Sequence, residues 1–175
     1  MIYKHKYRTP DGFSEMVMCS DGNVLTELSF ANSCADEEPT ACRLEKTLPV
    51  FTETCRWLDV YFSGREPGFA PAYRLENLTP FRKKVIDAML SIPYGSLVTY
   101  GSIAKRIAEA EDGKKVSAQA VGGAVGWNPI CLIIPCHRVI GANNALTGYG
   151  GGMRNKIALL ALEGHDISRF SMPKA

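Results

Sequence analysis

Alternation of apolar and polar residues near the start of the chain predicts a β-hairpin. Residues 13–18 form an apolar-rich run, residues 24–30 alternate weakly, and the Ser-Asp-Gly-Asn segment 20–23 between them is a turn signal. The following stretch, 31–40, is polar and contains three consecutive acidic residues, so it is predicted to be a loop. We therefore expect strands to come first in the fold.

Apolar residues at helical spacing predict an amphipathic helix over 49–62. Its inward face is expected to carry Val50, Phe51, Cys55, Leu58, Tyr61 and Phe62. The helix should end at Ser63-Gly64, and the stretch 65–78 is rich in Pro and Gly, which is typical of a connector. We place a domain boundary there. It gives an N-terminal α/β domain over 1–78 and a C-terminal domain over 79–175.

Three helices are predicted after the connector. The first begins at Pro80, which follows a capping Thr, and the segment 92–95 ends it. Its apolar face is expected to carry Phe81, Val85, Ile86, Met89 and Leu90. A second helix is predicted near 99–110, and a third from Ser117 to about Val125. The Gly-containing turn between the last two is similar to a helix-turn-helix, an arrangement that also occurs in proteins that do not bind DNA.

The third helix contains two interior glycines, Gly122 and Gly123. Each costs about 1 kcal/mol relative to Ala in a helix, so a compensating interaction is expected. Close packing inside the protein and close approach of a DNA backbone both supply one. Lys114 and Lys115 stand just before this helix, where they can meet phosphates.

Composition excludes several protein classes. Of the 175 residues, 46% are hydrophobic and 22% charged, which is ordinary for a globular protein and excludes a wholly disordered chain, a collagen-like repeat or a coiled coil. No uninterrupted apolar stretch is longer than the six residues of 157–162, and 130–134 has five, whereas a membrane helix needs roughly 20. No apolar region follows the charged residues of 1–8, so no signal peptide is expected and the protein is predicted to be cytoplasmic.

Charge is divided unequally between the two predicted domains. Residues 1–78 carry 8 Lys and Arg against 12 Asp and Glu, a net charge of −4, whereas residues 79–175 carry 12 against 6, a net charge of +6. A basic half favours a polyanionic partner such as nucleic acid, although ordinary variation between two surfaces gives the same asymmetry.

The cysteines do not have the spacing of a metal site. They are Cys19, Cys34, Cys42, Cys55, Cys131 and Cys136, and the chain has three His, His5, His137 and His165. No two cysteines are separated by two residues, the spacing of close ligand pairs in structural zinc sites, so no metal is expected. Free thiols in a reducing compartment are favoured for all but one of the six.

The stretch with the clearest chemical signal is 131–140, Cys-Leu-Ile-Ile-Pro-Cys-His-Arg-Val-Ile. Leu132 to Ile134 is predicted as a buried strand that ends at Pro135, which places Cys136 at the strand exit. His137 beside it can raise the thiolate fraction directly or through a water. A nucleophilic cysteine fits this pattern, and so does a buried cysteine beside a His that only satisfies backbone groups.

A Gly-rich segment, 141–152, follows and contains a single tyrosine, Tyr149. It lacks the GxxxxGK[ST] pattern of a phosphate-binding loop, so we interpret it as a lid or pocket wall around a small planar group. A helix is predicted over 153–163, ended by Gly164. Its inward residues are expected to be Ile157, Leu160 and Ala161.

The segment 134–139, Ile-Pro-Cys-His-Arg-Val, closely resembles the active-site motif of the O6-alkylguanine-DNA alkyltransferases. The resemblance extends from Thr79 to about Asp166 and is looser in the first half, where it rests on 58–64, Leu-Asp-Val-Tyr-Phe-Ser-Gly. In the second half it includes Tyr100, Ala120-Val121-Gly122-Gly123, Asn128-Pro129, Thr147-Gly148-Tyr149 and Glu163-Gly164.

This resemblance implies a fold, a reaction and a partner. The fold is a small α/β domain of ribonuclease H-like type followed by a mainly α winged helix-turn-helix domain that carries the active site. The reaction is direct reversal of damage in double-stranded DNA: a base is turned out of the helix, and a Cys takes the alkyl group from O6 of guanine or O4 of thymine. The thioether product is not displaced, so each molecule acts once. No cofactor, metal or membrane is expected, and the protein is expected to be a monomer.

The resemblance also implies roles for five catalytic residues. Cys136 matches the nucleophile, His137 the base that activates it through water, and Glu163 the carboxylate that orients the His. Tyr100 matches the residue that helps turn the nucleotide and donates to the leaving base. Asn128 matches the Asn at the turn that shapes the site.

Further residues are implied for DNA and substrate. The DNA-binding set is Gln119, Tyr100, Ala120, Gly122, Gly123, Lys114 and Lys115, and the substrate-pocket set is Tyr149, Gly150 and Gly151. The family commonly has an Arg where this chain has Gln119; a Gln can still fill the gap left by the flipped base. Arg138 is expected to brace the active-site turn. A related non-enzymatic branch has Trp in place of the reactive Cys, so Cys136 argues against that branch.

Two other functions compete with alkyl transfer: a non-catalytic alkylated-DNA-binding protein of the same fold, and a Cys–His hydrolase. Stoichiometry separates the three. They predict, in turn, a single methyl group on Cys136, binding without transfer, and sustained turnover of an ester.

Overall fold

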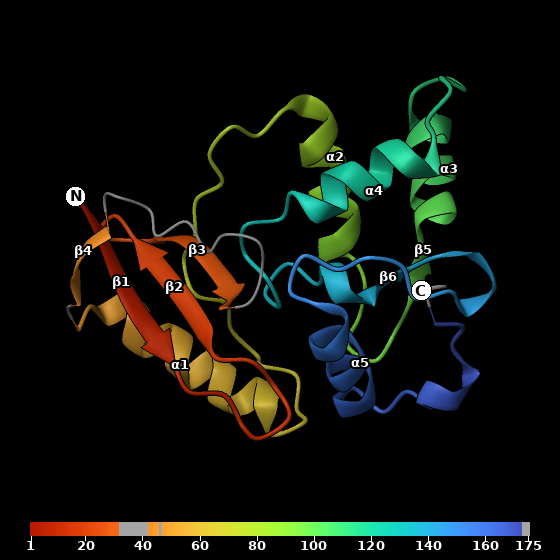
Figure 1. The fold of residues 1–175 in the computed structure, drawn as a ribbon. Coiled ribbons are helices and arrows are strands. Elements are labelled where there is room, and N and C mark those ends of the chain that lie inside the picture. Colours follow the sequence, from red (N-terminus) through yellow and green to blue (C-terminus); the bar gives the residue numbers. More distant parts are fainter. Residues whose placement is uncertain (32–41, 46, 173–175) are drawn as a thin grey trace.

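The computed structural model describes residues 1–31, 42–45 and 47–172 of the chain. Almost all of the loop predicted over 31–40, with Cys34, lies outside the described residues. Figure 1 shows the two parts of the molecule: a sheet with one long helix at the N-terminal end of the chain, and a group of shorter helices formed by the rest.

The N-terminal part contains a four-stranded sheet in the order β3-β2-β1-β4. The strands are β1 (Ile2–Tyr7), β2 (Met16–Ser20), β3 (Leu25–Phe30) and β4 (Cys42–Glu45). β2 is antiparallel to β1 and to β3, and β1 is parallel to β4. The predicted hairpin is confirmed as β2–β3, although β2 begins at Met16 rather than at residue 13.

Helix α1 (Pro49–Phe62) packs on one face of this sheet, and its predicted bounds are confirmed. Its buried residues are Val50, Phe51, Thr54, Trp57, Leu58, Tyr61 and Phe62. Cys55 is only half-buried. Thr54, which takes a place on the buried face, satisfies its hydroxyl by donating to the carbonyl oxygen of Val50 at 2.6 Å.

Three helices open the second part: α2 (Pro80–Leu90), α3 (Tyr100–Ala110) and α4 (Ala118–Gly126). Each begins after a capping hydroxyl, from Thr79, Thr99 and Ser117, that accepts a hydrogen bond from a backbone N–H in the first turn. The predicted starts and ends are therefore confirmed to within a residue. On α2, Val85, Ile86 and Met89 are buried, but Leu90 is exposed.

The remainder of this part surrounds a short two-stranded parallel sheet, β5 (Val98–Thr99) with β6 (Val139–Ile140). Helix α5 (Met153–Leu162) follows, and short 3-10 turns lie at 136–138, 142–144 and 167–169. The predicted inward face of α5 is wrong in part. Ile157 and Ala161 are not buried, whereas α5 buries Asn155, Lys156, Leu159 and Leu160.

The strand predicted over Leu132–Ile134 is wrong. These residues form a tight turn in which Leu132 has a positive φ of 71°, and Ile134 N donates to Ile130 O at 3.0 Å. Cys136 accordingly begins a 3-10 turn instead of ending a strand. The run is fully apolar because it is buried on all sides, and such a run does not distinguish a strand from a buried turn.

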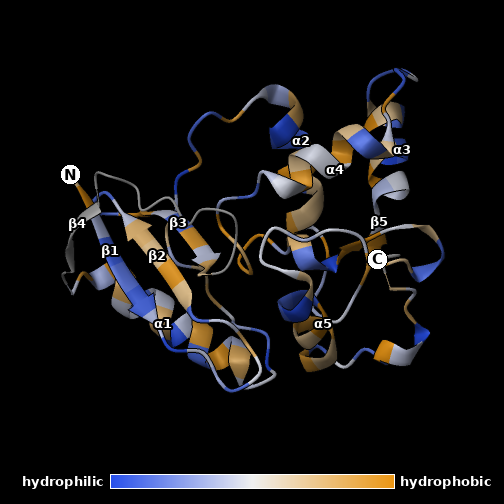
Figure 2. Ribbon diagram, viewed as in Figure 1, coloured by the Kyte–Doolittle hydropathy of each residue, from blue (hydrophilic) through white to orange (hydrophobic). Residues whose placement is uncertain are grey.

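One apolar cluster contains residues from both parts of the molecule, from Met16 in β2 to Leu159 in α5. Figure 2 shows that β2 is largely hydrophobic while β1 is largely hydrophilic. The two parts are also joined by main-chain hydrogen bonds at the edge of the sheet: Leu28 N donates to Pro129 O and Cys131 N donates to Leu28 O, both at 2.8 Å. The edge strand β3 thus holds the loop that leads to Cys136.

No helix in the described part of the chain is long and apolar enough to cross a membrane.

Candidate active site

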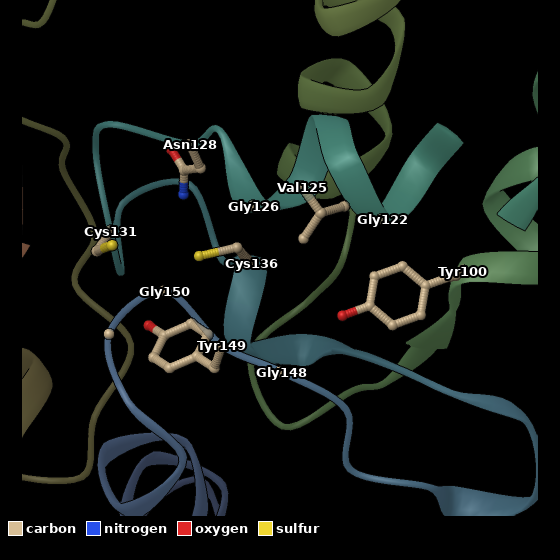
Figure 3. Close-up of a pocket in the computed structure, with 11 residues that line it drawn as sticks. Tyr100, Gly122, Val125, Gly126, Asn128, Cys131, Cys136, Gly148, Tyr149 and Gly150 are labelled. Atoms are coloured by element: carbon tan, nitrogen blue, oxygen red, sulfur yellow. The ribbon is translucent and has the colours of Figure 1, made fainter. Parts of the chain in front are cut away.

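A small cavity lies between the end of α4, the turn at Cys136 and the Gly-rich segment after it (Figure 3). Its lining residues are Tyr100, Gly122, Val125, Gly126, Asn128, Cys131, Cys136, Gly148, Tyr149, Gly150 and Gly151. The cavity encloses about 50 Å³. The sequence-predicted nucleophile, pocket residues and turn Asn therefore meet in one place.

Asn128 holds the loop that carries the two cavity cysteines. Its Nδ2 donates to Ile134 O at 2.8 Å, and its Oδ1 accepts from Ile130 N at 3.0 Å. The side chain thereby satisfies both sides of the turn at 130–134, where the strained Leu132 lies. Figure 3 shows its amide nitrogen above the sulfur of Cys136.

The environment of Cys136 favours its thiolate. The thiol of Cys131, acting as a hydrogen-bond donor, is the largest cause of a pKa of about 7 for Cys136; burial opposes this shift, and the amide of Asn128 adds to it. The same contact raises the pKa of Cys131 well above its ordinary value. A thiol whose pKa is lowered by neighbouring donors has the properties of a nucleophile.

His137, Arg138 and Glu163 form a buried polar cluster behind the cavity. Glu163 Oε1 lies 2.8 Å from His137 Nε2 and accepts from Arg138 Nη2 at 2.9 Å, and Glu163 Oε2 accepts from Arg138 Nε at 2.9 Å. Arg138 Nη1 donates to Ile92 O at 2.9 Å, so this Arg braces the turn as expected. The contact between the predicted base and its predicted carboxylate is present in the structure.

Burial and pairing shift the proton affinities of this cluster. Burial alone would raise the pKa of Glu163, but hydrogen bonds from His137 and Arg138 outweigh it and hold that pKa well below its ordinary value. Burial lowers the pKa of His137 despite the opposing effect of Glu163, so His137 is neutral at pH 7. His137 Nδ1 is buried and has no hydrogen-bond partner among the described residues.

Sequence reasoning missed Tyr61 as a member of this cluster. Its hydroxyl donates to Glu163 Oε1 at 2.7 Å and lies 3.1 Å from His137 Nε2. Tyr61 was assigned only to the apolar face of α1, because helical spacing does not distinguish a buried tyrosine that packs from one that also hydrogen-bonds. The signal available in the sequence was its place in the 58–64 segment that resembles the alkyltransferases.

Lys156 is a second missed residue. It is fully buried, its Nζ donates to Val139 O at 2.7 Å and lies 5.8 Å from the ring centre of Tyr149. Burial lowers its pKa to about 8, while the charge of Cys136 opposes the shift. A cation in this position also lowers the pKa of Cys136.

Hydrogen bonds of the Asn155 side chain connect the pocket wall of Tyr149, Gly150 and Gly151 to the N-terminal part of the chain. Asn155 Nδ2 donates to Gly151 O at 2.6 Å, and Asn155 Oδ1 accepts from Ser14 N at 2.9 Å. Gly151 has no room for a side chain, since a Cβ there would lie 2.6 Å from the ring of Tyr149 and 2.7 Å from that of Phe30. The wall is therefore packed against the N-terminal sheet.

Tyr100 closes the cavity from the opposite side, with its hydroxyl directed inward (Figure 3). The hydroxyl accepts from Thr147 Oγ1 at 3.2 Å, and the ring lies 3.9 Å from the place that a Cβ on Gly122 would occupy. A groove of about 530 Å³ begins on this side and shares Tyr100, Gly122 and Gly148 with the cavity.

Of the predicted DNA-binding residues, Tyr100, Gln119 and Gly122 line this groove, and Ala120 lines a second one. Gln119, Ala120 and Gly123 are exposed on α4. Lys114 and Lys115 are exposed and line the second groove, together with Lys84, which is paired with Glu111.

The structure thus brings Cys136, Asn128 and Tyr100 together with the pocket residues around the cavity. His137 and Glu163 do not line this cavity but contact each other in the buried polar cluster, and the two lysines line a separate groove.

The described part of the chain contains no group of three or more His, Cys, Asp or Glu able to hold a metal ion. Cys55, Cys131 and Cys136 are free thiols.

Comparison with known proteins identifies several similar to this chain. The sequence model described as 6-O-methylguanine DNA methyltransferase, DNA binding domain, matches residues 80–165. The methylated-DNA–protein-cysteine methyltransferase of Mycobacterium leprae (strain TN) is 38% identical over 167 residues, which cover 95% of each chain. The protein of the same name from Mycobacterium tuberculosis (strain ATCC 25618 / H37Rv) is 40% identical over 158 residues, which cover 90% of this chain and 91% of that one.

The fold is similar to solved structures as well. The crystal structure of Mycobacterium tuberculosis OGT in complex with DNA superposes with a TM-score of 0.78 at 37% identity, and the match covers 96% of this chain and 94% of that one. A mixed α/β fold, with a small N-terminal sheet and a C-terminal helical part, is common to both.

Proposed function

The chain belongs to the family of the methylated-DNA–protein-cysteine methyltransferases, and from this premise we propose that it repairs alkylated DNA by direct reversal. The alkyl group of O6-alkylguanine, or of O4-alkylthymine, moves irreversibly to Cys136 in a single turnover. The observation that carries this proposal is a buried thiol with a pKa of about 7 in a cavity beside a small-residue helix.

The transfer is a displacement at the alkyl carbon. The Cys136 thiolate attacks this carbon, the S–C bond forms as the C–O6 bond breaks, and the electron pair leaves with guanine, which takes up a proton. A thioether is a poor leaving group, so the free thiol is not regenerated. This chemistry needs no cofactor, and none is proposed.

The catalytic cluster supplies the proton steps. His137, neutral at pH 7, accepts the proton of Cys136 through a water, and Glu163 keeps the imidazole in place at 2.8 Å. Asn128 fixes the turn and stabilises the thiolate. The hydroxyl of Tyr100 donates to the departing base from the opposite wall.

DNA lies against α4 in this proposal. Residues 1–78 form an α/β domain of ribonuclease H-like type, and residues 79–175 form a winged helix-turn-helix domain in which α4 is the recognition helix. The small residues Ala120, Gly122 and Gly123 let α4 approach the groove closely, and Gln119 enters the stack in place of the flipped base.

Phosphate contacts and the assembly complete the proposal. Lys114 and Lys115, both exposed, meet phosphates of double-stranded DNA. Tyr149, Gly150 and Gly151 form the wall over the alkylated base. The protein acts as a monomer, and its location in the cytoplasm stays a prediction.

Mass spectrometry after incubation with a duplex that contains O6-methylguanine tests this function. We expect the mass of one methyl group on the peptide that contains Cys136, and no added mass in the Cys136→Ser variant. The matched control is Cys131→Ser, which removes the other thiol of the cavity and should still be methylated on Cys136. Methyl on Cys131 would overturn the assignment. Binding of the duplex without transfer would favour a non-catalytic damage-binding protein instead.

A further inference from the structure

Tyr61 connects the N-terminal helix α1 to the polar cluster behind the cavity. It is fully buried, and its ring stacks on Trp57 with ring centres 5.3 Å apart. Its ring centre lies 6.0 Å from that of Tyr94 and 6.2 Å from that of His137, and both pairs are edge-to-face. The Cys, Asn and His of the site all come from the second half of the chain, so Tyr61 is the contribution of α1.

The hydrogen bonds of Tyr61 and Glu163 together indicate which nitrogen of His137 carries the proton. A phenol has one proton to donate, and Tyr61 donates it to Glu163 Oε1 at 2.7 Å. The hydroxyl oxygen then presents a lone pair to His137 Nε2 at 3.1 Å, and the carboxylate presents another at 2.8 Å. Two acceptors therefore face Nε2, which must be the protonated nitrogen.

The other ring nitrogen is left as an acceptor. His137 Nδ1 is buried without a hydrogen-bond partner among the described residues. In a neutral imidazole with a proton on Nε2, Nδ1 holds the free lone pair and is the basic atom. The same bonds fix the plane of the ring, since Nε2 is held from two sides.

We propose that Tyr61 is a positioning residue for alkyl transfer: its hydroxyl holds His137 in the Nε2–H tautomer and orientation that leave Nδ1 free to accept the proton of Cys136. This inference rests on the proposed function for its reaction but not for its hydrogen bonds. Tyr61 does not line the cavity that holds Cys136, and it acts through His137 and Glu163.

The charged and titratable groups around His137 come from four elements. Glu163 at the end of α5, Arg138 in the same turn and Lys156 in α5 all influence its pKa. Tyr94, in the segment between α2 and β5, packs on Arg138 and Tyr61. Tyr61 is the group that donates to Glu163 from α1, so its removal leaves the carboxylate more basic and favours the imidazolium form of His137.

The variant Tyr61→Phe removes only the hydroxyl, and Tyr94→Phe is a matched control. The Tyr94 hydroxyl is also buried and has no hydrogen-bond partner among the described residues, and the Tyr94 ring packs against that of Tyr61. We expect Tyr61→Phe to slow transfer from free O6-benzylguanine on the order of 10-fold at pH 7, a share of the 10² to 10⁴ that a positioned base supplies. We expect the acidic limb of its pH–rate profile to move to higher pH, because the pKa of His137 rises.

Two further measurements separate positioning from general weakening of the fold. The ¹⁵N shifts of the His137 ring should show a proton on Nε2 in the unmodified protein, and this readout needs no transfer activity. In a His137→Asn background, Tyr61→Phe should cause no further loss, because residues that act through one another are not additive.

Several results would overturn the proposal: a proton on Nδ1, a pH limb that does not move, equal losses in Tyr61→Phe and Tyr94→Phe, or a full additional loss in the His137→Asn background. Failure of the proposed function looks different. In that case the unmodified protein acquires no alkyl group, whereas the ¹⁵N shifts still decide the tautomer.

Discussion

The thiol of Cys131 stabilises the thiolate of Cys136 in the cavity that both side chains line (Figure 3). Burial by itself would raise the pKa of Cys136, so the neighbouring donor offsets the cost of placing the nucleophile in a buried position. The contact shifts the two thiols in opposite directions. The pKa of Cys131 is raised, so Cys131 stays a thiol, while the pKa of Cys136 is lowered to about 7.

Replacement of Cys131 by Ala should therefore slow the reaction at neutral pH. Without the donor, the pKa of Cys136 rises, and each unit of increase lowers the thiolate fraction at pH 7 up to roughly tenfold. Rates with O6-benzylguanine measured from pH 6 to 10 should converge with those of the unmodified protein at the alkaline end. Cys131→Ser, which keeps a donor, should be affected much less; an identical profile for Cys131→Ala would contradict the role given to this thiol.

Gly151→Ala should damage the pocket wall. Its Cβ would fall 2.6 Å from the ring of Tyr149 and 2.7 Å from Phe30, which is 1% exposed and cannot move away freely. Overpacking of this kind costs about 1–3 kcal/mol, and thermal unfolding should show it together with a loss of transfer. Gly150→Ala is the control, because the nearest atom to its Cβ is Gly126 O at 3.9 Å. Equal stability of the two variants would mean that the wall adapts.

Glu163→Gln should destabilise the protein, since Arg138 would keep its buried charge without a counterion. Breaking a buried pair by removing one partner costs about 3–5 kcal/mol, measurable by denaturant unfolding. The exposed control Glu109→Gln, whose Lys105 partner is 3.9 Å away, should show no measurable change.

Stability at acidic pH should depend on the same carboxylate. Its pKa in the folded protein lies below the value of about 4.3 in an unfolded chain, so its stabilising contribution is present above pH 4.3 and is lost as the pH falls below that. The difference in free energy of unfolding between the unmodified protein and Glu163→Gln should therefore become smaller as the pH is lowered through this range. A gap that stays constant from pH 6 to 2 would rule out this linkage.

Gln119→Ala should slow methyl transfer from duplex DNA but scarcely alter the reaction with free O6-benzylguanine, which needs no base extrusion. Gln119 is exposed at the groove, outside the lining of the cavity, so its loss leaves the reactive site intact. Gln119→Arg should bind duplex more tightly through added attraction to phosphates. Equal losses with both substrates would show that Gln119 serves the structure.

The elements with strong local signals could be predicted from the sequence. Capping hydroxyls at Thr79 and Ser117, with apolar residues at helical spacing behind them, determine where α2 and α4 begin. Strand β1 was not predicted, because its residues Ile2–Tyr7 are mostly polar and only partly buried, and its place is fixed by pairing with β2 and β4. Long-range pairing of this kind leaves little local pattern.

The site divides in the same way. Cys136, His137 and Glu163 could be found because they belong to a motif, and the structure brings the last two within hydrogen-bond distance. Helical spacing predicts only packing for Tyr61, although it lies in the 58–64 segment of the resemblance. Lys156 follows two polar residues, Arg154 and Asn155, so nothing in the local pattern marks it as buried. The strand prediction for Leu132–Ile134 is wrong, since the shape of the turn at 130–134 depends on the Asn128 side chain and on the edge of β3 rather than on the pattern of its own residues.

The hydrogen bonds between Leu28 and the loop at 129–131 have a consequence for solubility. β3 is an outer strand of the sheet, and an unpaired outer strand is a template for aggregation. Here one end of β3 is covered by the connector, through Leu25 with Ala72 and Arg74, and the other end by the loop that carries the reactive thiol. The loop that positions the nucleophile thus also occupies main-chain groups of β3 that could otherwise pair with a strand of another molecule. Any change that displaces it would couple loss of repair to loss of the soluble protein.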